Sequence, residues 1–269
     1  VRARLGDAES DDKEVVILGR KVQWTADGIL CQADKKHREI VMEECGLEEG
    51  SKPSKVNGEK AEDPDVGGED EELAEGEERT QYRKSVARLN YMSQDCPDMM
   101  YPVKELCRSM SKPSRKAWNR LKKVARYMQG RKAIVWVFRW HEGVGELEVY
   151  TDSDWAGCTR TRRSTSGGMM TIGGNLIMAW SSTQGGVALS STEAEYYAMV
   201  EGATRGIGVQ DLAGELGMQV KINLHTDSSG AKAMASRRGS GRVRHIEAKV
   251  LWLQAEVLKG RIKLLKVDG

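Results

Sequence analysis

Residues 146–152 read ELEVYTD, and this stretch decides the fold because it is a strand that ends in a carboxylate. Apolar and polar side chains alternate along it, as they do in a strand with one buried face. Two more strands are predicted over 168–172 and 176–180, because the Gly-Gly-Asn sequence at 173–175 is typical of a hairpin turn. Asp152 therefore lies at the end of the first of three successive strands.

A long helix is expected next, over 191–216. Ser190 and Glu193 have the spacing of a capping box at its start, and Gly217 follows its end. The remaining elements are a strand, two helices and a last strand, at 220–226, 228–236, 246–258 and 261–267. The order β-β-β-α-β-α-α-β predicts a mixed α/β fold built around one sheet.

Three carboxylates occupy positions that can converge at one edge of this sheet. Asp152 and Asp227 stand at strand ends, and Glu195 lies one turn into the long helix. Acids that share a site raise each other's pKa, so such a cluster needs a cation. Oxygen ligands without a histidine or cysteine cluster favour Mg²⁺ or Mn²⁺, and two such ions can support phosphodiester hydrolysis.

Each acid also has a structural interpretation. Asp152 can be a turn residue, Glu195 an exposed helix acid, and Asp227 the cap of the helix that follows it. Glu193 is best explained by the capping box and is left out of the site. The spacing of these residues leaves both interpretations open.

The first part of the chain has a different pattern. Two strands joined by a tight turn are predicted over 14–24 and 28–32, followed by a helix over 35–45. Residues 51–79 are expected to be a disordered acidic linker, since ten acids and hardly an apolar side chain fall within 62–78. Three amphipathic helices and a strand follow, at 80–94, 98–111, 113–129 and 134–140. That strand is expected to meet the first strand of the sheet across a glycine-containing turn.

Composition limits the class of protein. The chain has 269 residues, of which 39% are hydrophobic and 30% charged, as in an ordinary soluble protein. Its longest apolar run, 133–138, is far shorter than the roughly 20 residues of a membrane-spanning helix, so no membrane partner is expected. Five cysteines without paired spacing argue against a disulfide framework and a zinc site. Since the chain opens without a methionine or an apolar leader, we expect an intracellular protein that is a piece of a longer one.

Charge is unevenly spread along the chain. Residues 1–80 carry 12 Lys+Arg against 23 Asp+Glu, whereas residues 81–269 carry 30 against 17. Much of the positive excess lies in 81–145. Such a basic segment suits a phosphate backbone, and the alternative is a set of helices whose lysines and arginines cover apolar surface.

Three motifs stand out in the second half: YTDSDWAG at 150–157, RSTSGG at 163–168 and ALSSTEAEY at 188–196. Together they resemble the ribonuclease H domain of copia-type (Ty1/copia) LTR retrotransposon Pol polyproteins. The segments before them are similar to the connection that precedes this domain, at 96–101 and 110–130, and to the end of a reverse transcriptase, at 17–50.

This resemblance implies a domain organisation. It assigns 1–50 to the C-terminal end of a reverse transcriptase, 51–79 to an acidic disordered linker and 80–145 to a basic helical connection. Residues 146–269 would be an α/β ribonuclease H domain, a mixed sheet with flanking helices, that stops before its last helix. The fourth acid of the family is expected beyond Gly269.

The resemblance also implies an activity. It makes Asp152, Glu195 and Asp227 catalytic and metal-binding residues. Together with two Mg²⁺ or Mn²⁺ ions they would hydrolyse the RNA strand of RNA–DNA hybrids, as part of a retrotransposon polyprotein. The alternative function is that of a relic that binds nucleic acid without cleaving it.

Two basic loops supply candidate contacts to nucleic acid. The candidates are Arg162, Arg163, Ser164, Arg242, Arg244 and His245. The first three follow Asp152, where the phosphates of a hybrid can pass, and a solvated hairpin tip is the alternative. Arg242 and Arg244 lie among glycines in a flexible basic loop, and His245 is expected to be a structural or phosphate-facing residue at the start of the following helix, with a general base as the alternative. The expected partners are an RNA–DNA hybrid and the rest of the reverse transcriptase and Pol polyprotein, in cytoplasmic virus-like particles, with the nucleus as a second location.

Overall fold

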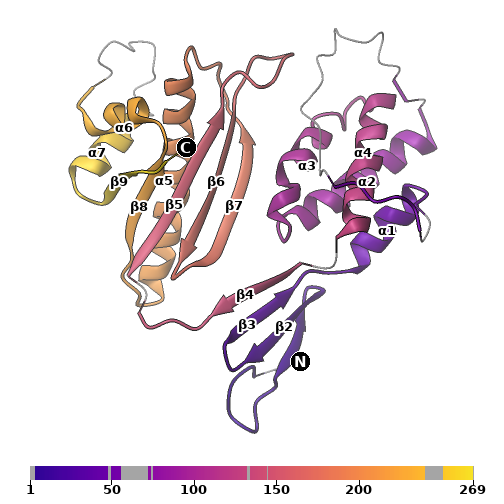
Figure 1. The fold of residues 1–269 in the computed structure, drawn as a ribbon, viewed down its shortest axis with the longest axis horizontal. Coiled ribbons are helices and arrows are strands. Elements are labelled where there is room, and N and C mark those ends of the chain that lie inside the picture. The colour runs from indigo at the N-terminus through magenta and orange to yellow at the C-terminus, as the bar shows by residue number, and fades with distance from the viewer. Residues whose placement is uncertain are drawn as a thin grey trace. The chain divides into compact units, whose positions relative to one another are not determined.

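A computed structural model of the chain describes residues 4–47, 50–55, 72–73, 75–131, 134–143, 145–239 and 251–268. The chain divides into two compact units, Val1–Trp140 (unit 1) and His141–Gly269 (unit 2), each of which is described by itself (Figure 1). None of the helices in the described ranges is long and apolar enough to cross a membrane.

Unit 2 is a mixed α/β structure built on one five-stranded sheet. Its elements are β5 (Glu146–Asp154), β6 (Thr165–Ile172), β7 (Asn175–Thr183), α5 (Ser191–Glu215), β8 (Lys221–Thr226), α6 (Ser229–Ser236), α7 (Trp252–Leu258) and β9 (Ile262–Lys266). The strand order is β7-β6-β5-β8-β9, antiparallel from β7 to β5 and parallel from β5 to β9. The predicted order of elements and the predicted mixed sheet are confirmed. Of the helix expected over 246–258, the structure describes only the part that forms α7.

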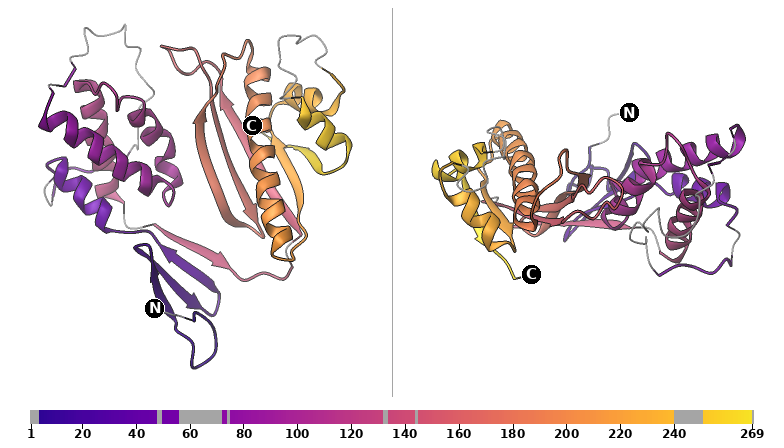
Figure 2. Two further views of the ribbon diagram at one scale, coloured as in Figure 1. Left: turned by 180° about the vertical axis from the view of Figure 1, so that it is seen from behind. Right: turned by 90° about the horizontal axis from the view of Figure 1, so that it is seen from above.

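Helix α5 runs along one face of this sheet (Figure 2). Two glycines allow the close approach. A Cβ atom at Gly202 would lie 2.4 Å from Cγ2 of Thr151, and one at Gly206 would lie 3.3 Å from Cγ2 of Val149. The helix is therefore in direct contact with β5, the strand that carries Asp152.

The start of α5 is fixed by side-chain caps. The Oγ atom of Ser190 accepts a hydrogen bond from the backbone N–H of Glu193 (3.2 Å). The Glu193 carboxylate in turn accepts hydrogen bonds from the backbone N–H of Leu189 (3.0 Å) and from the hydroxyl of Tyr197 (2.9 Å). The capping role predicted for Glu193 is confirmed, and it fixes the first turns of α5, which carry Glu195.

Unit 1 contains a four-stranded antiparallel sheet and a group of helices. The strands are β1 (Glu14–Ile17), β2 (Arg20–Thr25), β3 (Gly28–Gln32) and β4 (Val135–Arg139), in that order across the sheet. The single strand expected over 14–24 is two strands, because Leu18 and Gly19 adopt positive φ angles of 50° and 78° and turn the chain.

Strand β4 belongs to this first sheet. It pairs with β3, where Phe138 lies opposite Ile29 and Trp136 opposite Cys31. The expectation that 134–140 meets the first strand of the other sheet is therefore wrong. The alternation of apolar residues predicts the strand itself, but it is equally compatible with pairing to either sheet.

The helices of unit 1 share a core of their own. They are α1 (Lys36–Glu44), α2 (Glu77–Ser93), the 3₁₀ turn η1 (Pro97–Met99), α3 (Met100–Cys107) and α4 (Arg115–Gly130). Among the described residues, no side chain of β1–β4 belongs to this core. Leu73 does, with 1% exposure and its backbone N–H bound to the carbonyl of Pro113 (2.8 Å).

The predicted domain boundaries can be compared with the structure in two segments, 1–145 and 51–79. Unit 1 joins residues of the expected 1–50 and 80–145 segments in one compact body. Within the expected linker over 51–79, Leu73 is packed and α2 begins at Glu77, whereas 56–71 lie outside the described residues. The assignment of these segments to parts of a polyprotein stays a prediction.

Candidate active site

Three carboxylates gather at one edge of the unit 2 sheet. They belong to Asp152 in β5, Glu195 in α5 and Asp227 directly after β8, and one oxygen of each lies within 4.8 Å of the others. We call this group the acid cluster. In the described part of the chain it is the one group of three or more His, Cys, Asp or Glu side chains with such spacing.

Strand register explains why the two aspartates meet. β5 and β8 are parallel neighbours in which Tyr150 lies opposite His225, and each aspartate lies two residues further along its chain. The ends of parallel neighbours reach the same edge of a sheet. A hydrogen bond from the Thr151 hydroxyl to the carbonyl of His225 (3.1 Å) joins the two strands just before the aspartates.

Glu195 is the buried member of the cluster, with 9% exposure. Its Oε1 atom accepts two hydrogen bonds from Ser153, one from the backbone N–H and one from the hydroxyl, both 3.0 Å long. Its Oε2 atom is buried and has no hydrogen-bond partner among the described residues. One oxygen of this carboxylate is thus held in place while the other lacks a donor.

The environment raises the pKa of Glu195 to about 7. Burial contributes most, because it removes water from the charged form, and the negative charges of Asp152 and Asp227 add to it. The hydrogen bonds from Ser153 act in the opposite direction. A nearby cation would favour the ionised form of all three acids.

The residues fit a divalent metal ion. The exposed carboxylates of Asp152 and Asp227 and the unpartnered Oε2 of Glu195 provide three hard oxygen ligands, which suits Mg²⁺ or Mn²⁺. Among the described residues, no lysine or arginine forms an ion pair with these acids. The cluster therefore has the charge of a cation site, and within the described ranges no side chain supplies that cation.

The alternative roles of the acids can be compared with the geometry. The cap of α6 is Ser228, whose Oγ accepts from the backbone N–H of Ala231 (3.2 Å), so Asp227 does not fill that role. Glu195 is buried and is not the exposed helix acid of the alternative interpretation. Asp154 is the aspartate that organises the turn, because its carboxylate accepts a hydrogen bond from the backbone N–H of Thr165.

The loop after β5 separates the first three nucleic-acid candidates. Arg162 and Arg163 are exposed, and Arg162 adopts a positive φ of 54°. Ser164 is fully buried, and its hydroxyl accepts a hydrogen bond from the backbone N–H of Ala156 (3.0 Å). The expectation that Ser164 contacts nucleic acid is therefore wrong, because its hydroxyl closes the loop from inside. The other three candidates, Arg242, Arg244 and His245, lie outside the described residues.

One residue of the site carries only a weak signal in the sequence. Ser153 holds Glu195, but a small hydroxyl residue beside a strand-end acid does not by itself predict such a role. Further back along β5, away from the acid cluster, Glu148 binds His225 and accepts a hydrogen bond from the amide of Asn223 (2.7 Å); burial raises the pKa of Glu148, and these contacts together outweigh it and lower that pKa. No local pattern reveals a pairing across two strands.

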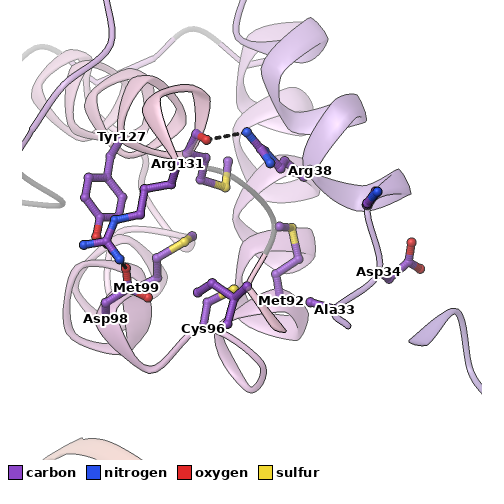
Figure 3. A pocket seen from close by; sticks show the side chains of 12 residues that line it. Ala33, Asp34, Arg38, Met92, Cys96, Asp98, Met99, Tyr127 and Arg131 are labelled. Carbon is purple, nitrogen blue, oxygen red and sulfur yellow. Dashed lines mark hydrogen bonds and ion pairs between the residues drawn. The ribbon is translucent and has the colours of Figure 1, made fainter. Parts of the chain in front are cut away.

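A pocket lies elsewhere, in unit 1 (Figure 3). Its wall is largely apolar and includes Met92, Met99 and Met128, with Arg38 and Arg131 at its edge. The guanidinium of Arg38 donates to the carbonyl of Met128 (2.7 Å). None of the acids or basic candidates named above lines this pocket.

The sequence is similar to retrotransposon polyproteins. It is 32% identical over 192 residues to the retrovirus-related Pol polyprotein from transposon RE2 of Arabidopsis thaliana. The matched residues make up 70% of this chain and 13% of that protein. It is 30% identical over 190 residues to the Pol polyprotein from transposon TNT 1-94 of Nicotiana tabacum, with 70% and 14% covered. The chain thus spans about one seventh of the length of these relatives. No family model matches the sequence.

Further similarities concern a shorter protein and solved structures. The secreted RxLR effector protein 161 of Plasmopara viticola is 36% identical over 127 residues, which are 47% of this chain and 89% of that protein. The RNase H1 of Halobacterium salinarum matches 46% of this chain and 86% of its own, at 18% identity and a TM-score of 0.32. LC11-RNase H1 in complex with RNA/DNA hybrid matches the same shares at 14% identity and a TM-score of 0.31.

Proposed function

This chain belongs to the retrovirus-related Pol polyproteins of copia-type transposons, and on that premise we propose that unit 2 hydrolyses the RNA strand of RNA–DNA hybrids. The observation that carries the proposal is the acid cluster, in which three carboxylate oxygens lie within 4.8 Å of one another. The mixed sheet brings these acids together from three different elements, and their charge calls for a divalent cation.

Asp152, Glu195 and Asp227 would hold the metal, with two ions bound in our proposal. When bound, Mg²⁺ or Mn²⁺ would activate a water molecule and stabilise charge on the leaving oxygen of a phosphodiester. The role of the protein is positioning: Ser153 fixes Oε1 of Glu195, and this leaves Oε2 available to the site. The paired strands β5 and β8 hold the two aspartates at the same edge of the sheet.

The substrate and partners form part of the same proposal. The exposed arginines 162 and 163 would bind phosphates of the hybrid beside the cluster. Contacts to the backbone carry little sequence information, so the shape of the hybrid and the 2′-hydroxyl of RNA would select the strand that is cut. The remaining partners would be the rest of the reverse transcriptase and Pol polyprotein, in cytoplasmic particles.

The test is cleavage of an end-labelled RNA–DNA hybrid in Mg²⁺ and in Mn²⁺, by this chain, by its Asp227→Asn variant and by a version extended past Gly269. Cleavage that the variant loses supports the proposal and indicates that these three acids suffice. Cleavage by the extended version alone also supports the activity and locates a further acid beyond residue 269. Hybrid binding without cleavage in every version contradicts the proposal and favours the non-catalytic relic.

A further inference from the structure

An exposed apolar patch lies next to the acid cluster in the chain, and the proposed mechanism does not use it. It consists of Trp155, Val187 and Leu189, with exposures of 55%, 48% and 67%, and we call it the tryptophan patch. Singly exposed apolar residues are common on protein surfaces, whereas apolar residues gathered from two loops often mark a contact surface.

The patch is held in place by backbone contacts. The indole Nε1 of Trp155 donates to the carbonyl of Ala188 (3.1 Å), which ties the loop after β5 to the loop before α5. Ala188 is only 3% exposed, and the neighbouring backbone N–H of Leu189 donates to the Glu193 cap (3.0 Å). The exposure of the indole ring is therefore a fixed feature of the fold.

Both halves of the patch are joined to segments that carry the acids. Trp155 comes three residues after Asp152, and Leu189 comes six residues before Glu195. Ser153 links the two segments, because it lies between Asp152 and Trp155 in the chain and donates two hydrogen bonds to Glu195. A polymer that extends beyond the acid cluster would meet this surface.

The chemistry of the patch indicates what it would contact. Nucleic acids present charged phosphates and the apolar edges of their sugars. Arg160, Arg162 and Arg163 are exposed on the same loop as Trp155 and supply the charge for phosphates. The N–H group of Trp155 is already bound to Ala188, so the exposed part of this residue offers apolar contact rather than a hydrogen-bond donor.

We propose that the tryptophan patch contacts the sugar edges in the shallow minor groove of an RNA–DNA hybrid and holds the duplex beside the acid cluster. The inference rests on the proposed function, since it takes the hybrid as the ligand. An A-form-like duplex has a wide, shallow minor groove, so that sugar edges are accessible to an apolar surface. The loop arginines would bind the phosphates on either side.

The experiment measures the affinity of the chain for a fluorescent RNA–DNA hybrid by anisotropy. An Asp227→Asn background in Mg²⁺ prevents consumption of the probe. We expect Trp155→Ala to weaken binding about five- to tenfold, and Leu189→Ala about two- to fourfold, because each variant loses apolar contact area. The slope of log K against log salt should stay unchanged in both, whereas Arg162→Ala should reduce it by about one.

A matched control is available just past the opposite end of α5. Leu216 follows the other end of α5 and is 68% exposed, nearly the same as Leu189, so Leu216→Ala should leave the affinity unchanged. Trp155→Phe keeps an aromatic face but removes the donor to Ala188, and it should retain most of the affinity. If Trp155→Ala lowers the melting temperature, its weaker binding could reflect a damaged fold. Leu189→Ala removes no hydrogen bond, so its affinity then tests whether the patch contacts the hybrid.

Two results would overturn the inference. The first is an affinity of Leu189→Ala and of a folded Trp155→Ala equal to that of the background. The second is loss of self-association in the same variants with unchanged hybrid affinity, which would assign the patch to a protein contact. The proposed function fails differently, through hybrid binding by the parent chain without cleavage.

Discussion

The carboxylates of Asp95 and Glu44 in unit 1 differ in their partners from the acid cluster of unit 2. In unit 1, the Nε–H of Arg20 lies between both carboxylate oxygens of Asp95, at 2.8 and 2.9 Å. Glu44 accepts from the hydroxyl of Ser85 (2.6 Å) and pairs with the guanidinium of Arg88 (3.6 Å). In unit 2, Glu195 shares its site with two more acids, and its only donor among the described residues is Ser153.

This difference separates structural acids from a candidate active site. An arginine neutralises a carboxylate, and a charge-assisted hydrogen bond then stabilises the fold. Serine donates hydrogen bonds without supplying charge, so three neighbouring acids keep their need for a cation. The units also differ in their cores, because α5 packs on the sheet in unit 2 while the helical core of unit 1 excludes its strands.

The largest effect is expected from removing one charge of the cluster. Asp227→Asn should lower cleavage of a labelled hybrid by about 100- to 1,000-fold, because a metal ligand is lost. Asp95→Asn is the matched change in unit 1. It should leave cleavage within about twofold and lower the free energy of unfolding by about 1–2 kcal/mol, since it weakens the pair with Arg20. Equal loss of cleavage in both variants would contradict the distinction between the two kinds of acid.

The contact between α5 and the sheet gives the next largest effect. Gly202→Ala places a Cβ atom 2.4 Å from Cγ2 of Thr151, the residue before Asp152, and should lower the free energy of unfolding by about 1–3 kcal/mol. Gly208→Ala, on the same helix with no atom within 4 Å, should raise it by about 0.5–1 kcal/mol through helix propensity. Chemical denaturation measures both, and a stable Gly202→Ala variant would refute the tight packing.

Ser153 provides a smaller and more specific effect. Ser153→Ala keeps the backbone donor and loses the hydroxyl donor to Glu195, so we expect cleavage to fall about tenfold and half-saturation to need more Mg²⁺. Ser153→Thr should retain most of the activity.

A second serine–glutamate pair serves as the control. The Ser182 hydroxyl donates to the Glu201 carboxylate (2.8 and 2.6 Å), and Glu201 is also bound by Arg205. Ser182→Ala should therefore leave the Mg²⁺ dependence of cleavage unchanged. If Ser182→Ala raised the Mg²⁺ concentration for half-saturation as much as Ser153→Ala does, the effect at Ser153 would be merely structural.

The smallest effect is a dependence of stability on pH. The folded protein raises the pKa of Glu195 to about 7 from an ordinary value of 4.5, so the unfolded chain loses this proton at lower pH than the folded one. The contribution of Glu195 to stability is thus fully present below about pH 4.5 and is lost as the pH rises to about 7.

Melting curves of the metal-free protein test this effect. Between pH 5 and pH 8 the melting temperature of the parent should fall by a few degrees more than that of Glu195→Gln. Millimolar Mg²⁺ at pH 8 should recover the difference in the parent alone. Identical pH profiles of parent and variant would contradict the raised pKa.

Local signals made much of unit 2 predictable. The capping box at Ser190 and Glu193, the hairpin glycines and the alternation along β5 all involve residues close in sequence. The three acids could be singled out because each stands at the end of a strand or near the start of a helix. The pairing of β4 and the burial of Ser164 could not be predicted, since β4 pairs with the distant strand β3 and the carbonyl of Ser164 is bound by the backbone N–H of Gln184.

The sequence by itself determined the order of helices and strands in unit 2, the identity of the three acids and the family, because these are written in periodicity, caps and motifs. Tertiary structure alone decided that β5 and β8 run side by side, that Ser153 holds one oxygen of Glu195 and that burial raises its pKa. It also set the tryptophan patch through one bond between Trp155 and Ala188. These features arise from contacts between residues more than 30 positions apart, and no local pattern specifies such contacts.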